Sequence, residues 1–149
     1  MPARLVLIRH AKAEQGSPDL DRALSDRGRS DAAAIGHWLV AQDVNPDRVV
    51  ISPSRRTRQT WEHAGTTPAE ADGRIYDNTV ADLLEIIRET PDDVQTLVLV
   101  GHNPSMGELA ALIDPDVREF PTSATAIIEL DDWADPRSGR LSAMAVPRG

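Results

Sequence analysis

The stretch RLVLIRHAKAEQG, residues 4–16, runs from an apolar segment into a positive pair and then into a polar loop. Residues 4–8 form a nearly unbroken apolar run, which is typical of a central strand covered on both faces. Arg9 and His10 follow this run directly. Either the strand simply reaches solvent there, or these two side chains end a buried strand because a ligand meets them. The other motifs of the chain favour the second interpretation.

Further apolar runs and helical repeats organise the rest of the chain. Additional strands are predicted at 47–52, 96–100, 123–130 and 140–146, the last of them at an edge of the sheet. Apolar residues with the helical period predict helices over 26–42, 54–64, 79–89 and 103–113. Asn103 is expected to cap the last helix, with Pro104 at its first position. Strands that alternate with helices predict an α/β fold with a mostly parallel central sheet and helices on both faces.

Length and composition limit the function classes. The 149 residues fit one domain that covers residues 1–149. The chain has no cysteine, which excludes a disulfide framework, a thiolate nucleophile and a cysteine-based zinc site. Its formal net charge of -8 argues against general binding to nucleic acid, although a few clustered arginines can still hold an anion. The first apolar run is too short for a signal sequence or a membrane span. We expect a cytoplasmic protein without nucleic-acid or membrane partners, and a monomer.

Basic and histidine side chains follow three of the predicted strands. Arg9 and His10 follow the first, SPSRRTRQT at 52–60 follows the second, and GHNPS at 101–105, with His102, follows the third. Parallel strands bring their carboxyl ends to one edge of a sheet, where ligands bind. Arginine forks match phosphate oxygens, helix N-termini attract anions, and a neutral histidine can attack phosphorus. These junctions therefore predict a phosphoryl-transfer site.

A metal site is the alternative interpretation of two histidines, and the spacing disfavours it. His10 and His102 lie on different junctions, without an H-x-H or H-E-x-x-H pattern. We expect neither a metal nor another cofactor. The remaining histidines, His37 and His63, lie off the apolar stripes of their helices and are expected in solvent.

Taken in order, RHAKAE at 9–14, SPSRRTRQT and GHNPS resemble the histidine phosphatase superfamily, the phosphoglycerate-mutase-like group. The sequence is most similar to the short SixA-type phosphohistidine phosphatases of that group. LDRALSDRGRSDAAAIGHWL at 20–39 and FPTSATAIIEL at 120–130 extend the resemblance over most of the chain. The resemblance implies a three-layer α/β/α sandwich and a ping-pong mechanism without a metal.

The resemblance also assigns catalytic roles to four residues. His10 would be the nucleophile that becomes phosphorylated, and Arg9 would bind the phosphoryl oxygens. Alignment of the pattern SP-x-x-R-x-x-Q-T on residues 52–60 makes Arg56 the second phosphate-binding arginine. His102 would stabilise the transferring phosphoryl group. The neighbouring arginines are expected at the helix surface or the mouth of the pocket, namely Arg55 and Arg58.

Two positions depart from the family pattern. Ala11 stands where many members have glycine, although alanine is familiar in the SixA-type branch. Gly16 stands where mutase-like members have an asparagine. The phosphate contact of that asparagine is either missing here or supplied by Lys12 or Ser17. Asn103 is a further candidate for substrate binding, through its backbone.

No acidic residue has a diagnostic context for the proton donor that mutase-type phosphatases use. The donor is Asp77, Asp82 or Glu85, or the chain has none. An imidazole leaving group needs less help from a strong acid than an alkoxide does, so the expected substrate is phosphohistidine in a protein. The alternative is a small-molecule phosphomonoesterase, followed by a non-catalytic phosphate-binding module. A mutase would need insertions that this chain lacks.

Overall fold

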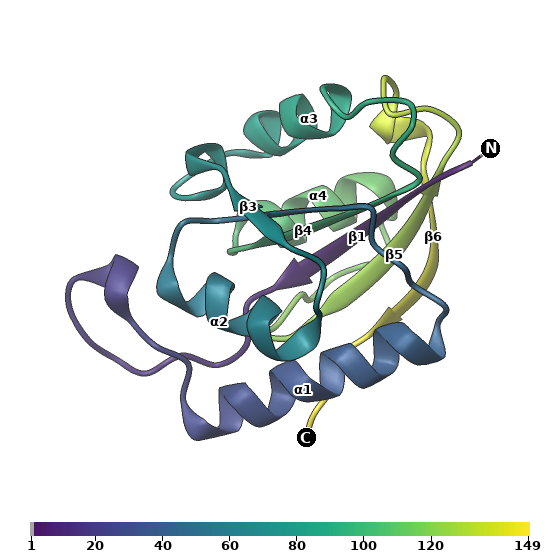
Figure 1. Ribbon diagram of the computed structural model, residues 1–149. Helices are drawn as coiled ribbons and strands as arrows, with labels where there is room; N and C mark the ends of the chain where they lie inside the picture. The colour runs from purple at the N-terminus through teal and green to yellow at the C-terminus, as the bar shows by residue number, and fades with distance from the viewer. Residues whose placement is uncertain (1) are drawn as a thin grey trace.

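A computed structural model describes residues 2–149 and contains one mixed sheet between two layers of helices (Figure 1). The strands are β1 (Ala3–Arg9), β2 (Arg48–Ile51), β3 (Ala69–Ala71), β4 (Thr96–Gly101), β5 (Thr125–Leu130) and β6 (Arg140–Ala145). The helices are α1 (Asp26–Ala41), α2 (Arg55–Ala64), α3 (Val80–Arg88) and α4 (Ser105–Ile113). Short 3-10 turns are η1 (Asp19–Asp21), η2 (Gly73–Ile75) and η3 (Pro136–Ser138). Among these described residues, no helix is both long and apolar enough to span a bilayer.

The sheet has the strand order β3-β2-β4-β1-β5-β6. The first four strands are parallel where they pair, whereas β5 runs antiparallel to both of its neighbours, β1 and β6. The prediction of an α/β fold with a mostly parallel centre is confirmed, and so is the edge position of the last strand. The sequence pattern does not predict β3, because its residues, Ala-Glu-Ala, are all exposed and show no apolar repeat.

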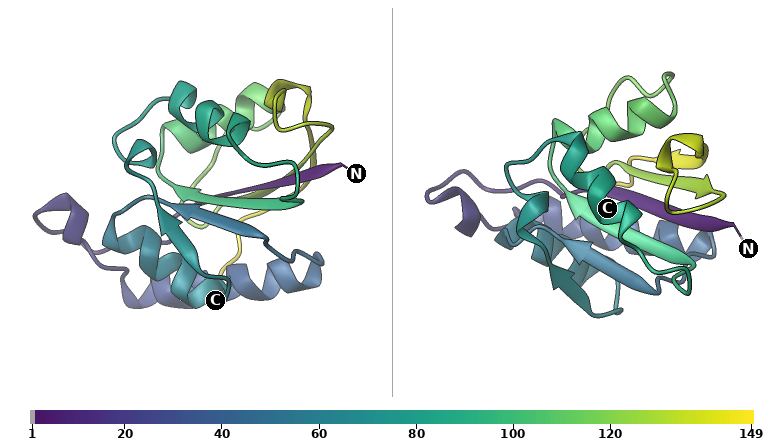
Figure 2. Two further views of the ribbon diagram at one scale, coloured as in Figure 1. Left: turned by 45° about the horizontal axis from the view of Figure 1, so that its top comes forward. Right: turned by 90° about the horizontal axis from the view of Figure 1, so that it is seen from above.

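The two faces of β1 belong to two different cores. Leu5 and Leu7 pack in the core beneath α3 and α4, whereas Val6 and Ile8 pack in the core beneath α1 and α2. Successive side chains of a strand point to opposite faces, so a strand with helices on both sides must be apolar throughout. Figure 2 shows the sheet between the two helix pairs from two further directions. The three-layer sandwich that the resemblance implied is confirmed.

The start of α4 differs from the prediction. The helix begins at Ser105, so Pro104 does not occupy its first position. The Asn103 side chain lies beside this start, where its Oδ1 accepts the hydrogen bond from the N–H of Gly107 at 3.1 Å. The carbonyl of His102 accepts from the N–H of Met106 at 3.0 Å, and the carbonyl of Pro104 accepts from the N–H of Glu108 at 2.9 Å. The prediction of Asn103 as the N-cap is therefore wrong, because Pro104 occupies that position, although the Asn103 side chain still accepts from the first turn of the helix.

The first turn of α1 lies directly against the segment that follows β1. Ser25 caps this helix by accepting from the N–H of Gly28 at 3.0 Å. The N–H of Ser25 in turn donates to the carbonyl of Lys12 at 2.9 Å. A Cβ added at Gly28 would lie only 1.9 Å from that carbonyl oxygen. Glycine therefore allows α1 to touch the backbone just beyond His10.

The substitution Gly28→Ala is expected to lower the free energy of unfolding by about 1–3 kcal/mol, because the methyl group overpacks against a backbone carbonyl. Denaturant unfolding followed by circular dichroism measures this change. Gly73→Ala is the matched control, since nothing lies within 4 Å of a Cβ built there. Its effect should stay within about 0.5 kcal/mol. Equal destabilisation by both substitutions would contradict the close approach of α1.

Candidate active site

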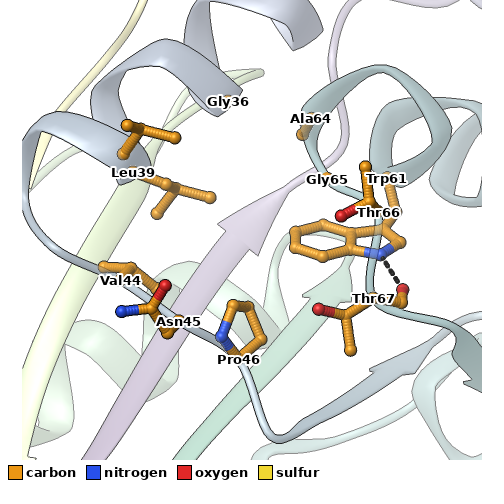
Figure 3. Close-up of a pocket in the computed structure, with 11 residues that line it drawn as sticks. Gly36, Leu39, Val44, Asn45, Pro46, Trp61, Ala64, Gly65, Thr66 and Thr67 are labelled. Carbon is orange, nitrogen blue, oxygen red and sulfur yellow. Dashed lines mark hydrogen bonds between the residues drawn. The ribbon is translucent and has the colours of Figure 1, made fainter.

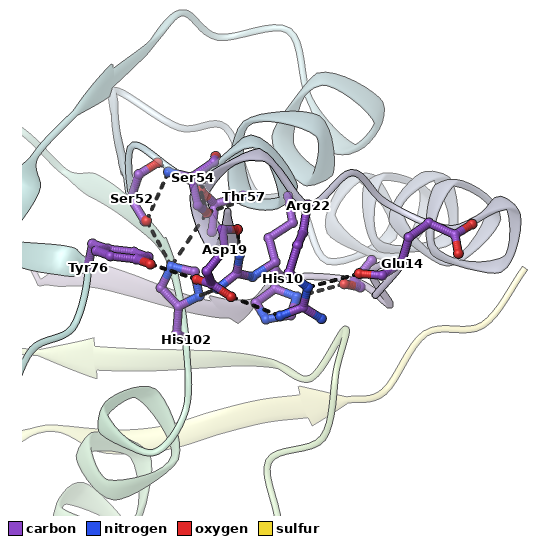
Figure 4. A network of polar contacts seen from close by, with 11 residues as sticks. His10, Glu14, Asp19, Arg22, Ser52, Ser54, Thr57, Tyr76 and His102 are labelled. Atoms are coloured by element: carbon purple, nitrogen blue, oxygen red, sulfur yellow. Dashed lines mark hydrogen bonds and ion pairs between the residues drawn. The ribbon is translucent and has the colours of Figure 1, made fainter. Parts of the chain in front are cut away.

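The residues that follow three parallel strands lie at one edge of the sheet. In the β1–β4 ladder, Arg9 pairs with Gly101, and β2 lies in register on the other side of β4. The N–H of His10 donates to the carbonyl of Gly101 at 3.0 Å. The rings of His10 and His102 therefore lie close together, with 5.3 Å between their centroids (Figure 4). The prediction that the strand ends converge is confirmed.

His10 is buried, and one hydrogen bond sets the orientation of its ring. Its Nδ1 lies 2.7 Å from the carbonyl oxygen of Ala11. Because a carbonyl only accepts, Nδ1 carries the proton and Nε2 keeps its lone pair. Burial lowers the pKa of His10 to about 4, and the positive charges of Arg56 and Arg9 add to this effect. A neutral imidazole with a free Nε2 is the state that nucleophilic attack on phosphorus requires.

Backbone contacts on both sides hold His10 in place. The N–H of Ala11 donates to Oγ1 of Thr60 at 3.0 Å, and this hydroxyl donates to the carbonyl of Arg56 at 2.7 Å. On the other side, the N–H of Ser123 donates to the carbonyl of His10 at 3.1 Å. Ser123 has a φ of 69°, the left-handed conformation of a tight turn. These contacts fix the end of β1 between α2 and the turn before β5.

His102 contacts Ser52 through one ring nitrogen and Arg56 through the other. Its Nε2 lies 2.8 Å from the Ser52 hydroxyl, and its Nδ1 lies 3.3 Å from Nη2 of Arg56. A guanidinium only donates, so Nδ1 accepts and Nε2 carries the proton. Burial lowers the pKa of His102 to about 3, which keeps the ring neutral at physiological pH. In this conformation His102 orients Arg56 and has no free N–H for a phosphoryl oxygen.

Arg56 is the arginine of α2 that faces the histidines. Its side chain is buried, whereas Arg55 and Arg58 are exposed. The Nε atoms of Arg9 and Arg56 are buried and have no hydrogen-bond partner within residues 2–149. Buried donors are nearly always paired in native proteins, so these two guanidinium groups mark where an oxyanion would find its donors.

A carboxylate from outside the predicted set completes the site. Oδ2 of Asp19 accepts from Tyr76 Oη at 2.6 Å and from Arg56 Nη2 at 3.0 Å (Figure 4). Oδ1 accepts from Arg22 Nη1 at 3.0 Å, and the backbone carbonyl of Asp19 accepts from Arg56 Nη1 at 2.8 Å. These donors, with Tyr76 the largest cause, hold the pKa of Asp19 well below its usual range. Asp19 is therefore ionised at neutral pH.

The sequence contains signals for some of these additional residues. Ser52 directly follows β2, so the rule that selects the two histidines also selects Ser52. Asp19 and Arg22 stand three residues apart, a spacing that suits an ion pair, but they lie well beyond the strand end, in the polar loop before the first predicted helix. Tyr76, the only tyrosine of the chain, follows η2 in an irregular segment, and nothing in the neighbouring sequence points to the site.

Three predicted substrate-binding residues lie outside this network. Lys12 and Ser17 are exposed, and within residues 2–149 neither side chain makes a hydrogen bond. Asn103 uses its side chain inside the fold, where Nδ2 donates to the carbonyl of Phe120 at 2.7 Å. The same carbonyl accepts from Nη1 of Arg9 at 3.3 Å. Asn103 thus supports the turn that contacts Arg9, and substrate contacts of all three residues stay predictions.

Two of the three candidate proton donors are engaged elsewhere in the fold. Asp82 accepts from the N–H of Thr79 at 3.0 Å in the capping box of α3. Glu85 pairs with Arg74 at 3.0 Å. Neither is therefore placed to protonate a leaving group, and Asp77 is exposed. In the part of the chain that the structure describes, residues 2–149, no three His, Asp or Glu side chains are grouped so that they could hold a metal ion.

A separate pocket of about 290 Å³ lies between the C-terminal parts of α1 and α2 (Figure 3). Leu39, Pro46 and Trp61 contribute to its wall, and Nε1 of Trp61 donates to the carbonyl of Thr67 at 2.8 Å. Arg56 lies at the opposite, N-terminal end of α2. This pocket is therefore distinct from the site around the two histidines.

The proton positions on the two histidines can be measured by long-range ¹H–¹⁵N NMR. His10 is expected as the Nδ1–H tautomer and His102 as the Nε2–H tautomer. Both rings should stay neutral well below the ordinary histidine pKa of about 6.5. The expected pKa of His10 is about 4 and that of His102 about 3, because loss of hydration disfavours the charged form of both rings. A His10 that titrates near pH 6.5, or that carries its proton on Nε2, would contradict the neutral, Nδ1-protonated state that the structure indicates.

The sequence of this chain is similar to a family model and to known proteins. Residues 5–79 match the family model of the histidine phosphatase superfamily (branch 1). The uncharacterized protein Rv1276c of Mycobacterium tuberculosis is 36% identical over 158 residues, which cover 95% of this chain and 100% of the relative. Phosphohistidine phosphatase SixA of Escherichia coli is 28% identical over 143 residues, which cover 87% of this chain and 86% of that protein.

The fold is also similar to that of solved structures. The protein histidine phosphatase SixA complexed with tungstate superposes with a TM-score of 0.85 and 26% sequence identity, and the match covers 97% of each chain. The family model and the relative that is 36% identical along 95% of the chain point to the same conclusion as the converging strand ends. The chain belongs to the histidine phosphatase superfamily.

Proposed function

We propose that this chain hydrolyses phosphohistidine in a protein substrate through a covalent intermediate on His10. The observation that carries the proposal is the state of His10, which is buried, neutral and bonded through Nδ1, so that Nε2 is free. Arg9 and Arg56 lie close enough to influence its pKa, and each has a buried Nε without a partner within residues 2–149. A free imidazole nitrogen and two arginines are the groups that phosphoryl transfer needs.

The reaction would consist of two displacements at phosphorus. First, Nε2 of His10 bonds to phosphorus while the bond to the substrate imidazole breaks, and the leaving nitrogen keeps the electron pair. Then water bonds to phosphorus, the bond to Nε2 breaks, and phosphate leaves with the hydrogens of the water. Arg9 and Arg56 would neutralise the charge on the phosphoryl oxygens in both steps. His102 would keep Arg56 in its orientation.

The state of the acidic residues supports a P–N bond as the bond that is cleaved. An alkoxide needs a proton donor as it leaves, whereas an imidazole needs less help. Asp82 and Glu85 are engaged within the fold, and Asp19 is held ionised by its three donors. None of these carboxyl groups is prepared to protonate an ester oxygen at neutral pH.

Similarity to SixA proteins supports the same substrate class. The Escherichia coli relative is named a phosphohistidine phosphatase, and the matching SixA structure is described as a protein histidine phosphatase. That structure holds tungstate, a tetrahedral oxyanion as phosphate is. A protein substrate is therefore the first to test, and small phosphate esters are the comparison.

The substitution His10→Ala should abolish turnover and leave the fold intact, because His10 lies at a strand end and contributes little to the core. Turnover is measured on a phosphohistidine protein, on p-nitrophenyl phosphate and on sugar and nucleotide phosphates, with circular dichroism as the folding control. The wild-type protein is expected to prefer the phosphohistidine protein. Efficient hydrolysis of sugar or nucleotide phosphates, without activity on the phosphohistidine protein, would replace the proposed substrate by a small ester.

The substitution Arg56→Ala should lower kcat/KM by about 10²–10³-fold, as expected for a lost donor to the transition state. Arg55→Ala is the matched control, because Arg55 is the preceding residue of the same helix and is exposed. It should retain nearly all activity. A mild loss for Arg56→Ala together with a severe loss for Arg55→Ala would show that the wrong arginine has been assigned.

A further inference from the structure

Asp19 is the exposed member of the network around the two histidines. Its side chain is 46% exposed, whereas His10 is only 8% exposed. Asp19 lies in η1, on a loop that is closed at its base by a hydrogen bond from the N–H of Glu14 to the carbonyl of Ala23 at 2.8 Å. Figure 1 shows this loop projecting from the sheet edge beside α2. The carboxylate is thus open to solvent, and Figure 4 shows it beside the two histidine rings.

The carboxylate of Asp19 can accept a further hydrogen bond. An ionised carboxylate offers about four lone-pair positions. Oδ2 accepts from Tyr76 and Arg56, while Oδ1 accepts from Arg22 among the side chains of the described residues 2–149. About one acceptor position on Oδ1 is therefore left for a donor that arrives from solvent.

Opposite charges lie side by side at this point of the site. Arg56 contacts the Asp19 carboxylate through Nη2, and the same nitrogen contacts His102. A substrate that brings its phosphoryl group to Arg56 therefore brings its leaving group near Asp19. The arginine suits the negative phosphoryl oxygens, whereas the carboxylate suits a leaving group that is positive and carries an N–H.

We propose that Asp19 binds the leaving imidazole through its second ring nitrogen and so selects phosphohistidine over phosphate esters. This role rests on the proposed function. In phosphohistidine one ring nitrogen is bonded to phosphorus, and the other is free to carry a proton. A carboxylate that accepts from this N–H favours the protonated, cationic ring. A cationic ring is a good leaving group because it departs as neutral imidazole.

Bonds and charges balance in this step. Nε2 of His10 bonds to phosphorus, the P–N bond of the substrate breaks, and its electron pair stays on the leaving ring. That ring enters as a cation with its N–H on Asp19, and it leaves neutral with the same proton in place. No proton has to reach the atom that was bonded to phosphorus. The chain can therefore cleave a P–N bond without a separate general acid.

The same carboxylate does not favour cleavage of a phosphate ester. The ester oxygen needs a proton as it leaves, and Asp19 has none to give while its donors hold it ionised. An alkyl leaving group also offers no N–H to Oδ1, and its developing negative charge is repelled. Asp19 thus favours substrates with a cationic leaving group over substrates whose leaving group becomes negative.

The substitution Asp19→Asn removes the charge and keeps an oxygen that can accept from Arg56 or Tyr76. The value of kcat/KM for a phosphohistidine peptide is expected to fall about 10- to 100-fold, as for a lost hydrogen bond to a charged group. For p-nitrophenyl phosphate, whose leaving group needs no acid and offers no N–H, kcat/KM is expected to fall much less, so that the preference for the peptide decreases. Asp19→Glu, which restores the charge, should recover part of the activity on the peptide.

Asp21→Asn is the matched control, because Asp21 is an exposed acid of the same turn. It should affect neither substrate. An equal loss on both substrates for Asp19→Asn would mean that Asp19 only orients Arg56, and an equal gain would mean that it only competes with the phosphoryl group. Either result, or no change on either substrate, would overturn this role and leave the proposed function standing. A wild-type protein that hydrolyses p-nitrophenyl phosphate but not the peptide would overturn both.

Discussion

Parallel pairing of β1 with β4, and of β4 with β2, is the constraint on which the site depends. These ladders end at one level of the sheet, so the residues that follow the three strands, His10, Ser52 and His102, have to meet there. Helix pairs bury the sheet on both faces, and the chemistry is therefore anchored in a close-packed core. A shift of β1 by one residue would exchange the faces of all its side chains and would remove His10 from the site.

Burial at this edge also determines the charges. An imidazolium at His10 would lose its hydration and would lie close to Arg9, Arg22 and Arg56, so the neutral ring is favoured. The arginines themselves need an anion nearby, and Asp19 supplies one to two of them. A chain with a net charge of -8 thus gathers three arginines around His10.

The parts of the site that could be predicted from the sequence are those that follow directly from a strand. His10 and His102 each stand two residues after a continuous apolar run, so the predicted strand ends identify both, and the resemblance separates Arg56 from its neighbours. Asp19 and Tyr76 could not be found in this way, because they come from irregular segments 57 residues apart and meet only in the folded chain. The edge strand β3 could not be predicted for a related reason, since its exposed residues, Ala-Glu-Ala, show no apolar repeat and pair with β2 through the backbone and the ion pair of Glu70 with Arg48.

The proposed mechanism depends on which ring nitrogen of His10 attacks phosphorus. Rapid mixing with substrate, an alkaline quench and NMR of the isolated phosphopeptide distinguish the two ring nitrogens. A phosphoryl group on Nε2 of His10 is expected, because Nδ1 is bonded to the carbonyl of Ala11. A phosphoryl group on Nδ1 of His10 or on His102, or an active protein in which no histidine becomes labelled, would contradict the mechanism.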